Sequence, residues 1–144
     1  MLRIDRSAKK FIRLDRNSLT EAELKERYDI QQMIRQSPLE FSEEIGVPLL
    51  LVGEEIRPTD FCDDRIDLLA IDNLGSAVIL EIKRGTDRYE LLQSLGYAGM
   101  VAKWPAEQFI SERSKLTNKP PQEVKDEIVK APFVTPLGCI DFEH

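Results

Sequence analysis

Residues 65–83 decide the fold of this chain, and they read RIDLLAIDNLGSAVILEIK. Two aliphatic runs flank a turn at 73–75, where Gly75 suits a position with positive φ. The pattern predicts a β-hairpin with a three-residue loop, in which Asp72 pairs with Ser76. Apart from a few charges, both strands are apolar on both faces, which predicts a sheet covered on both sides by helices.

The sequence on either side of this hairpin predicts several helices and further strands. Ser18 and Glu21 form a capping-box pattern that predicts a helix start. This helix should end near Ser37, because the residue before Pro38 avoids the helical region, and Pro38 suits the first turn of a second short helix. The remaining elements are expected at 49–56 (strand), 87–103, 106–118 and 121–130 (helices) and 133–140 (a candidate last strand).

Length and composition favour one globular domain. The chain has 144 residues, of which 42% are hydrophobic and 32% charged. We divide it into an N-terminal arm, 1–17, and a main domain, 18–144, whose core motifs span 18–104 and whose extension spans 105–144. No run of about 18 apolar residues and no secretory leader is visible, so a cytoplasmic protein without membrane spans is expected.

The charge is acidic and unevenly distributed. A net charge of -6 argues against a protein that holds duplex nucleic acid by bulk electrostatics alone. The stretch from Leu39 to Asp72 contains ten acidic residues and only two basic ones, Arg57 and Arg65. These acids form either a solvated acidic face or, in part, the lining of a divalent-cation site.

Asp67, Glu81 and Lys83 are the residues whose spacing points to chemistry. Glu81 and Lys83 leave the same face of their strand, and the expected hairpin register places Asp67 opposite Glu81. Directly opposed Cβ atoms lie about 4.5–5.5 Å apart, and two such carboxylates repel unless a metal or a proton compensates them. Oxygen ligands without Cys or His favour Mg²⁺ or Mn²⁺. A buried ion-pair network is the alternative interpretation.

These residues occur in an order that resembles a known family. Asp67, then Glu81-Ile82-Lys83, then Gln93-Ser94-Leu95-Gly96-Tyr97 resemble the D, (D/E)-x-K and Q-x-x-x-Y elements of the PD-(D/E)XK nuclease superfamily. Over about residues 18–104 the chain is most similar to the catalytic domain of NucS-type (EndoMS-type) and RecB-like endonucleases.

The resemblance implies a fold and a set of roles. The fold would be α/β, a three-layer α/β/α sandwich with a restriction-endonuclease-like αβββαβ core, a mixed central sheet and 133–140 as its last strand. Asp67, Glu81 and the Ile82 carbonyl would bind Mg²⁺ or Mn²⁺, Lys83 would activate the attacking water, and Gln93 would orient the site. Further candidates are Arg65, Arg84, Arg88 and Tyr97 for nucleic-acid contacts and Glu26 and Glu54 as supporting carboxylates.

Two functional hypotheses follow. The first is a divalent-metal-dependent DNA endonuclease domain that hydrolyses phosphodiester bonds in DNA repair, restriction or defence. A homodimer or an additional domain would supply affinity for nucleic acid. The second is a catalytically inactive nuclease-like nucleic-acid-binding or scaffold module. The joint presence of Asp67, Glu81 and Lys83 favours the enzyme.

Overall fold

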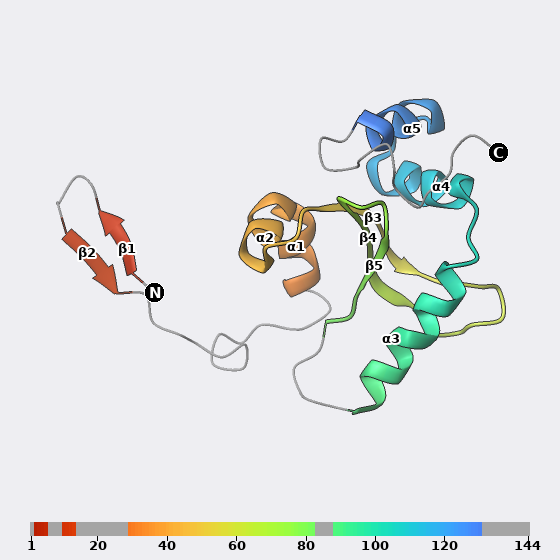
Figure 1. Cartoon of the computed structure of the whole chain (residues 1–144), viewed down its shortest axis with the longest axis horizontal. Coiled ribbons are helices and arrows are strands. Elements are labelled where there is room, and N and C mark those ends of the chain that lie inside the picture. Colours follow the sequence, from red (N-terminus) through yellow and green to blue (C-terminus); the bar gives the residue numbers. More distant parts are fainter. Residues whose placement is uncertain (1, 6–9, 14–28, 83–87, 131–144) are drawn as a thin grey trace.

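Three antiparallel strands and five helices form the main part of the computed structural model, which describes residues 2–5, 10–13, 29–82 and 88–130 (Figure 1). The main sheet has the strand order β3-β4-β5, with β3 at Leu49–Ile56, β4 at Ile66–Asp72 and β5 at Ala77–Leu80. The helices are α1 (Gln31–Gln36), α2 (Pro38–Ile45), α3 (Arg88–Val101), α4 (Ala106–Thr117) and α5 (Pro121–Lys130).

The β4–β5 hairpin has the predicted loop and register. The Asp72 N–H donates to the Ser76 carbonyl at 3.0 Å, and Gly75 adopts a φ of 80°. The Asp72 carboxylate closes the turn by accepting the N–H groups of Leu74 and Ser76, each at 2.8 Å. Such an Asx-type turn fixes the loop length, and the loop length fixes which residues face each other across the hairpin.

Strand β3 runs antiparallel to β4 and carries a bulge between Leu51 and Gly53. A Cβ built on Gly53 would lie 2.6 Å from the Cδ1 atom of Ile56, so a larger residue here would have to displace the Ile56 side chain. One extra residue in β3 moves every later side chain to the other face of the sheet. The bulge therefore decides on which side Glu54 lies.

Both faces of β4 are buried, as the sequence predicts. Leu69 and Ile71 belong to a core that α3, α4 and α5 cover with Tyr97, Phe109 and Ile128. On the other face, Ile34 of α1 packs against four residues of the sheet and forms a second core with them. These are Leu49, Leu51, Leu68 and Ala70. Figure 1 shows α1 and α2 on one side of the sheet and α3 on the other.

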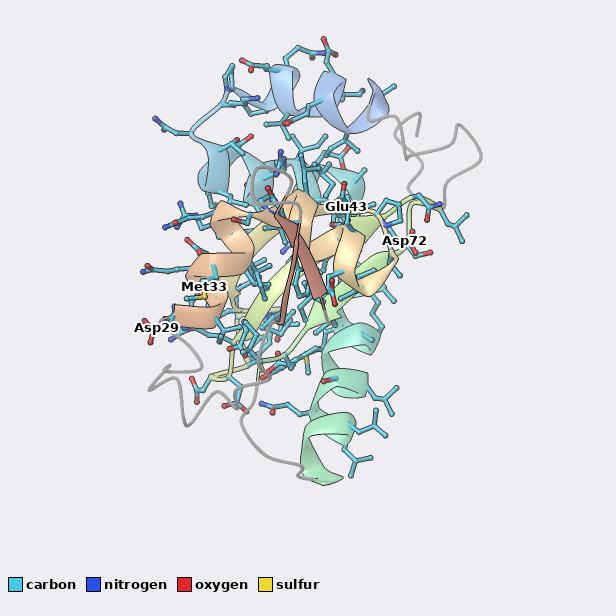
Figure 2. All side chains as sticks on the ribbon, turned by 90° about the vertical axis from the view of Figure 1, so that its left-hand side faces the viewer. Asp29, Met33, Glu43 and Asp72 are labelled. Atoms are coloured by element: carbon cyan, nitrogen blue, oxygen red, sulfur yellow. The ribbon has the colours of Figure 1, made fainter. Side chains whose placement is uncertain are left out.

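Helices α1 and α2 cover the second core. Ile34 of α1 is 6% exposed and points to the sheet, whereas its neighbour Met33 lies on the outside (Figure 2). Helix α2 begins with Pro38 at its first turn, as expected, and ends at Gly46, whose φ of 72° terminates the helix.

Helices α4 and α5 are joined to the sheet through Arg113. Its guanidinium donates to the Glu127 carboxylate of α5 at 2.7 and 3.3 Å and also to the Leu51 carbonyl of β3. This contact ties α4 to β3, the edge strand of the described sheet. The predicted helices at 106–118 and 121–130 are thus confirmed and integrated into the core.

Some expectations fall outside the described residues. The helix start at Ser18 and the last strand at 133–140 are among them. The strands of the main sheet that the structure describes are all antiparallel. The N-terminal arm contains a small hairpin of its own, with β1 (Leu2–Asp5) paired to β2 (Lys10–Arg13). In the described parts of the chain, none of the helices has the length and apolar character needed to cross a membrane.

Candidate active site

The hairpin brings Asp67 and Glu81 together. Leu68 pairs with Leu80, so the next pair along the ladder places Asp67 opposite Glu81, which directly follows β5. The Glu81 Oε1 atom accepts the Asp67 N–H at 3.4 Å, and the Asp67 Oδ2 atom accepts the Ile82 N–H at 2.9 Å. The two carboxylates therefore meet across the open end of the hairpin, in the register that the sequence predicts.

Asp67 is fully buried, with 0% of its surface exposed. It shares the β4 face of Leu69 and Ile71, which is the face that α3 covers. A buried carboxylate next to another carboxylate needs compensation, and the Ile82 N–H supplies part of it through a hydrogen bond. Carboxylate oxygens are also the ligands that hard divalent ions prefer.

Helix α3 contributes a hydrogen-bonded pair to the same side of the sheet. The Gln93 Nε2 atom donates to the Tyr97 hydroxyl at 2.7 Å, and Tyr97 is only 3% exposed. Burial raises the pKa of Tyr97 above its ordinary value, the Gln93 hydrogen bond opposes this, and the negative charges of Asp64 and Glu81 raise the pKa further. The tyrosine hydroxyl thus lies within electrostatic reach of Glu81.

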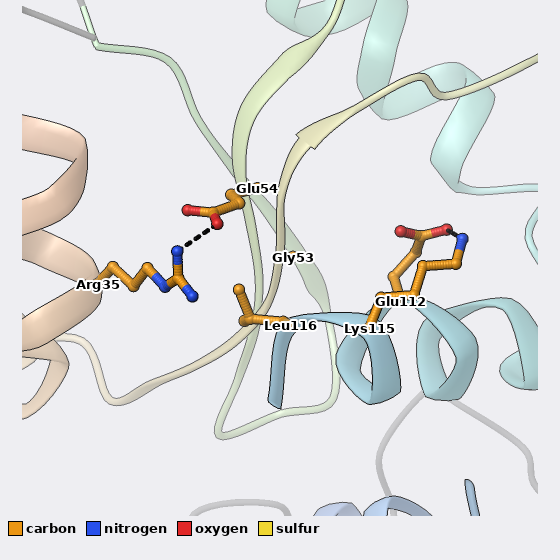
Figure 3. A pocket seen from close by; sticks show the side chains of 6 residues that line it. All are labelled: Arg35, Gly53, Glu54, Glu112, Lys115 and Leu116. Carbon is orange, nitrogen blue, oxygen red and sulfur yellow. Dashed lines mark hydrogen bonds and ion pairs between the residues drawn. The ribbon is translucent and has the colours of Figure 1, made fainter. Parts of the chain in front are cut away.

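Glu54 lies on the other face of the sheet. It pairs with Leu68, which belongs to the second core, and direct partners share a face. Its Oε1 atom lies 2.5 Å from the Arg35 Nη1 atom of α1 (Figure 3). The structure therefore does not bring Glu54 together with Asp67, because the bulge in β3 shifts the register by one residue.

The cavity next to Glu54 is bordered by two ion pairs. It has a volume of about 240 Å³ and is lined by Arg35, Gly53, Glu54, Glu112, Lys115 and Leu116 (Figure 3). Arg35 pairs with Glu54, and Lys115 pairs with Glu112 at 2.7 Å. Both carboxylates that line the cavity, those of Glu54 and Glu112, are thus paired with basic side chains of the same cavity.

The other predicted site residues are placed less completely. Lys83, Arg84 and Glu26 lie outside the described residues, and Arg88 begins α3 without a described side chain. Arg65 is exposed just before β4, two residues from Asp67. The Ile82 N–H donates to the Asp67 carboxylate. The resemblance assigns the other backbone group of this residue, its carbonyl, to the metal.

The structure adds neighbours that the sequence did not single out. The negative charges of Asp64 and Cys62, in the loop between β3 and β4, raise the pKa of Tyr97. Trp104 anchors this loop by donating from Nε1 to the Pro58 carbonyl at 3.0 Å, while Phe61 at its turn is fully exposed. The acidic run at 63–64 is visible in the sequence, but no spacing rule connects it with a helix 30 residues later.

The donor set at Asp67 fits a divalent cation of the magnesium type. Among the described residues, no group of three or more His, Cys, Asp or Glu side chains could hold a metal. Two carboxylates with waters and substrate oxygens are nonetheless a common way of holding Mg²⁺, whereas Zn²⁺ asks for nitrogen or sulfur ligands. The site is therefore compatible with a cation held by Asp67 and Glu81.

Comparison with known proteins adds no assignment. No protein-family model matches the chain, and neither the curated proteins nor the solved structures contain a match to it.

Proposed function

We propose that this chain is a Mg²⁺- or Mn²⁺-dependent endonuclease domain that hydrolyses phosphodiester bonds, with DNA as its substrate, in repair, restriction or defence. The single observation that carries the proposal is the convergence of Asp67 and Glu81 across the β4–β5 hairpin, with Asp67 fully buried on the face of α3. The ordered D, (D/E)-x-K and Q-x-x-x-Y elements give this convergence its chemical interpretation.

Asp67 and Glu81 would hold the cation, together with the Ile82 carbonyl. When bound, a divalent ion would supply charge neutralisation at the phosphate and would lower the pKa of a water that it holds. Lys83, two residues after Glu81 in the sequence, would orient the attacking water and stabilise negative charge on the phosphate. The Ile82 N–H orients the Asp67 carboxylate by donating a hydrogen bond to its Oδ2 atom.

Gln93 and Tyr97 would orient the carboxylates. Because Gln93 donates to the Tyr97 oxygen, the hydroxyl proton of Tyr97 remains able to donate to a neighbouring carboxylate or to a phosphate. The raised pKa keeps Tyr97 protonated at neutral pH. The pair therefore acts as a neutral positioning element and not as a proton acceptor.

Nucleic-acid affinity must overcome the negative charge of the chain. Arg65, Arg84 and Arg88 flank the site in the sequence and are the candidate phosphate contacts. The exposed ring of Phe61 offers a surface on which a base can stack. A second subunit or a further domain would supply the remaining affinity, since the net charge of -6 repels DNA.

The finer description of the fold belongs to the same proposal. It is the restriction-endonuclease-like αβββαβ core with a mixed sheet and three layers, whose last strand the sequence assigns to 133–140, outside the described residues. The arm at 1–17, the domain at 18–144 and a cytoplasmic location complete the assignment.

The test is cleavage of a labelled panel of single-stranded, duplex, flap and mismatched DNA with Mg²⁺ or Mn²⁺. Asp67→Asn and Lys83→Ala should each lower the cleavage rate by about 10³-fold, the scale expected when a charge that acts in the transition state is removed. Glu54→Gln is the matched control, because it removes a carboxylate from the neighbouring strand on the opposite face, and it should retain the wild-type rate within a few-fold.

Two results would contradict the nuclease. One is cleavage that persists in Asp67→Asn. The other is a wild type that neither cleaves nor is stabilised against heat by Mn²⁺ or Ca²⁺, because a real site stabilises the folded chain by about 2.7 kcal/mol when the ion is present at 100 times its dissociation constant. Stabilisation that Asp67→Asn abolishes, without cleavage, favours the nuclease-like binding module.

A further inference from the structure

The N-terminal arm and the rest of the chain have opposite charges. Residues 1–17 contain six basic residues and two acidic ones and have a net charge of +4, so with a total of -6 the rest of the chain carries -10. No stretch of the same length elsewhere in the chain has a net charge above +2. The basic residues of the arm are Arg3, Arg6, Lys9, Lys10, Arg13 and Arg16. A basic segment on an otherwise acidic chain is typical of an arm that binds a polyanion.

The structure arranges part of this charge on a two-stranded hairpin. Strands β1 and β2 form a sheet of their own, in which Leu2 pairs with Arg13 and Arg3 pairs with Ile12 (Figure 1). Residues 3 and 13 are ten apart in the sequence but lie on adjacent rungs of this ladder. Neighbouring strands are about 4.8 Å apart, and each residue advances a strand by about 3.3 Å, so the two backbones are close together. Lys10, which begins β2, is the third basic residue of these strands.

A ribbon of this size suits the major groove of a DNA duplex. The groove is about 12 Å wide and admits a two-stranded β-ribbon. Each strand of the hairpin has four residues and is thus about 13 Å long, which matches about four phosphates of one DNA strand at about 3.4 Å each. Because an isolated two-stranded hairpin is at best marginally stable in water, a bound duplex would also stabilise the ribbon.

The acidic main domain is the competing partner for the arm. Some of its acidic side chains already have basic partners within the domain, as Glu54 has Arg35 and Glu127 has Arg113. A duplex carries one negative charge per about 1.7 Å of its axis, and basic residues that bind it release condensed counterions. Carboxylates spread over a protein surface offer no comparable release. The charge density therefore favours nucleic acid as the partner.

We propose that the arm at 1–17 binds the phosphate backbone of a DNA duplex, with the β1–β2 hairpin in the major groove and Arg3, Lys10 and Arg13 supplying phosphate contacts. The inference rests on the proposed function and names the class of substrate that the main domain would cleave. Phosphate contacts fix the position and orientation of a duplex without reading its sequence. The arm thus holds a duplex against an acidic domain that would otherwise repel it.

Binding of a labelled duplex in EDTA tests the arm separately from cleavage, because no divalent ion is then present to support hydrolysis. Fluorescence anisotropy of the full chain is measured between about 50 and 200 mM salt. The triple variant Arg3→Gln, Lys10→Gln, Arg13→Gln should lower the slope of log K against log salt by about 2 to 3, at about 0.9 per phosphate contact, and should weaken binding about tenfold or more at low salt. Asp5→Asn should strengthen binding, because it removes an acidic residue from β1, and a misfolded chain would not produce such a gain.

The matched control is the triple variant Lys103→Gln, Lys115→Gln, Lys119→Gln. It removes the same charge from the chain, but at exposed or half-exposed lysines in and beside α4, so it should keep a slope close to that of the wild type. The proposal is overturned if the arm variant keeps the wild-type slope, if the control lowers the slope equally, or if a single strand of the same sequence binds as tightly as the duplex. It is also overturned if the arm variant binds the duplex more tightly, because the arm then covers the acidic domain, or if that variant loses binding to phosphatidylserine vesicles and not to the duplex.

Cleavage in Mg²⁺ or Mn²⁺ separates this inference from the proposed function. Binding that depends on the arm, in a chain that cleaves nothing, keeps the arm and rejects the nuclease. Cleavage by a chain whose duplex binding does not depend on the arm keeps the nuclease and rejects the arm.

Discussion

Helices α3 and α5 lie on the same core but distribute their residues in opposite ways. In α5, Val124 and Ile128 are completely buried, and the polar residues Gln122, Glu123 and Asp126 face outward. In α3, the hydrogen-bonded Gln93–Tyr97 pair faces the sheet and leucines face outward. Packing alone explains α5, whereas α3 carries polar groups inside and apolar groups outside that packing alone does not explain.

The difference shows where function is to be sought in this chain. A helix that only covers a core follows the hydrophobic period, as α5 does. A helix that departs from the period on both sides has a reason on each side. On its inner side α3 holds the Gln93–Tyr97 pair within electrostatic reach of Glu81, and on its outer side Leu91, Leu92 and Leu95 are exposed.

The largest expected effect compares one buried aliphatic residue of α5 with one exposed residue of α3. Ile128→Ala should lower the free energy of unfolding by about 3 kcal/mol, because it removes buried methyl groups and leaves a cavity. Leu92→Ala should change it by less than about 0.5 kcal/mol when measured in dilute, monomeric protein. Urea unfolding followed by circular dichroism measures both. Equal losses in the two variants would mean that the outer side of α3 is packed within the single chain.

A somewhat smaller effect should follow from removing the link between α4, α5 and β3. Arg113→Met should cost about 2 kcal/mol, since the Arg113 side chain is only 11% exposed and donates to both Glu127 and the Leu51 carbonyl. Lys115→Met is the matched control in the same helix, because the Lys115 side chain is 67% exposed and its pair with Glu112 is a surface pair. A similar loss in both variants, by urea unfolding, would show that Arg113 is not the link.

The hairpin could be predicted from the sequence because its determinants are local. Gly75 and Asp72 fix the turn, the turn fixes the register, and the register places Asp67 opposite Glu81 without knowledge of the rest of the fold. The helices after Gly85 were predictable for a similar reason, since prolines and apolar spacing mark their limits.

The position of Glu54 could not be predicted in this way. In a regular ladder it would pair with Asp67 and share its face, but the bulge between Leu51 and Gly53 moves it opposite Leu68. Only the tertiary fold shows that Gly53 lies close to the Ile56 side chain and that Arg35 pairs with the Glu54 carboxylate on the other face of the sheet. The electrostatic effect of Asp64 and Cys62 on Tyr97 could not be predicted either, because it joins residues that are distant in the sequence.

An effect of about 1 kcal/mol should report the inner side of α3. Tyr97→Phe removes the acceptor of the Gln93 amide and should cost about that much, as an ordinary buried hydrogen bond does. Gln93→Leu should cost a similar amount, and the double variant should cost less than the sum of the two single variants. Strict additivity in this double-mutant cycle, measured by urea unfolding, would mean that the two side chains do not act as a pair.

The smallest expected effect is a pH dependence carried by α5. The Arg113 hydrogen bond lowers the pKa of Glu127 below its ordinary value of 4.5, burial opposes this, and the charges of Arg113 and Lys119 lower it further. Well above pH 4.5 both the folded and the unfolded chain hold Glu127 ionised, and the stabilisation is complete. As the pH falls below 4.5 the unfolded chain takes up the proton first, so the stabilisation is lost progressively until the pH passes the lower pKa of the folded chain. Unfolding measured from pH 6 to about pH 3 should show a stability loss in the wild type that is smaller in Glu127→Gln, whereas Glu123→Gln, an exposed acid of the same helix, should keep the wild-type profile.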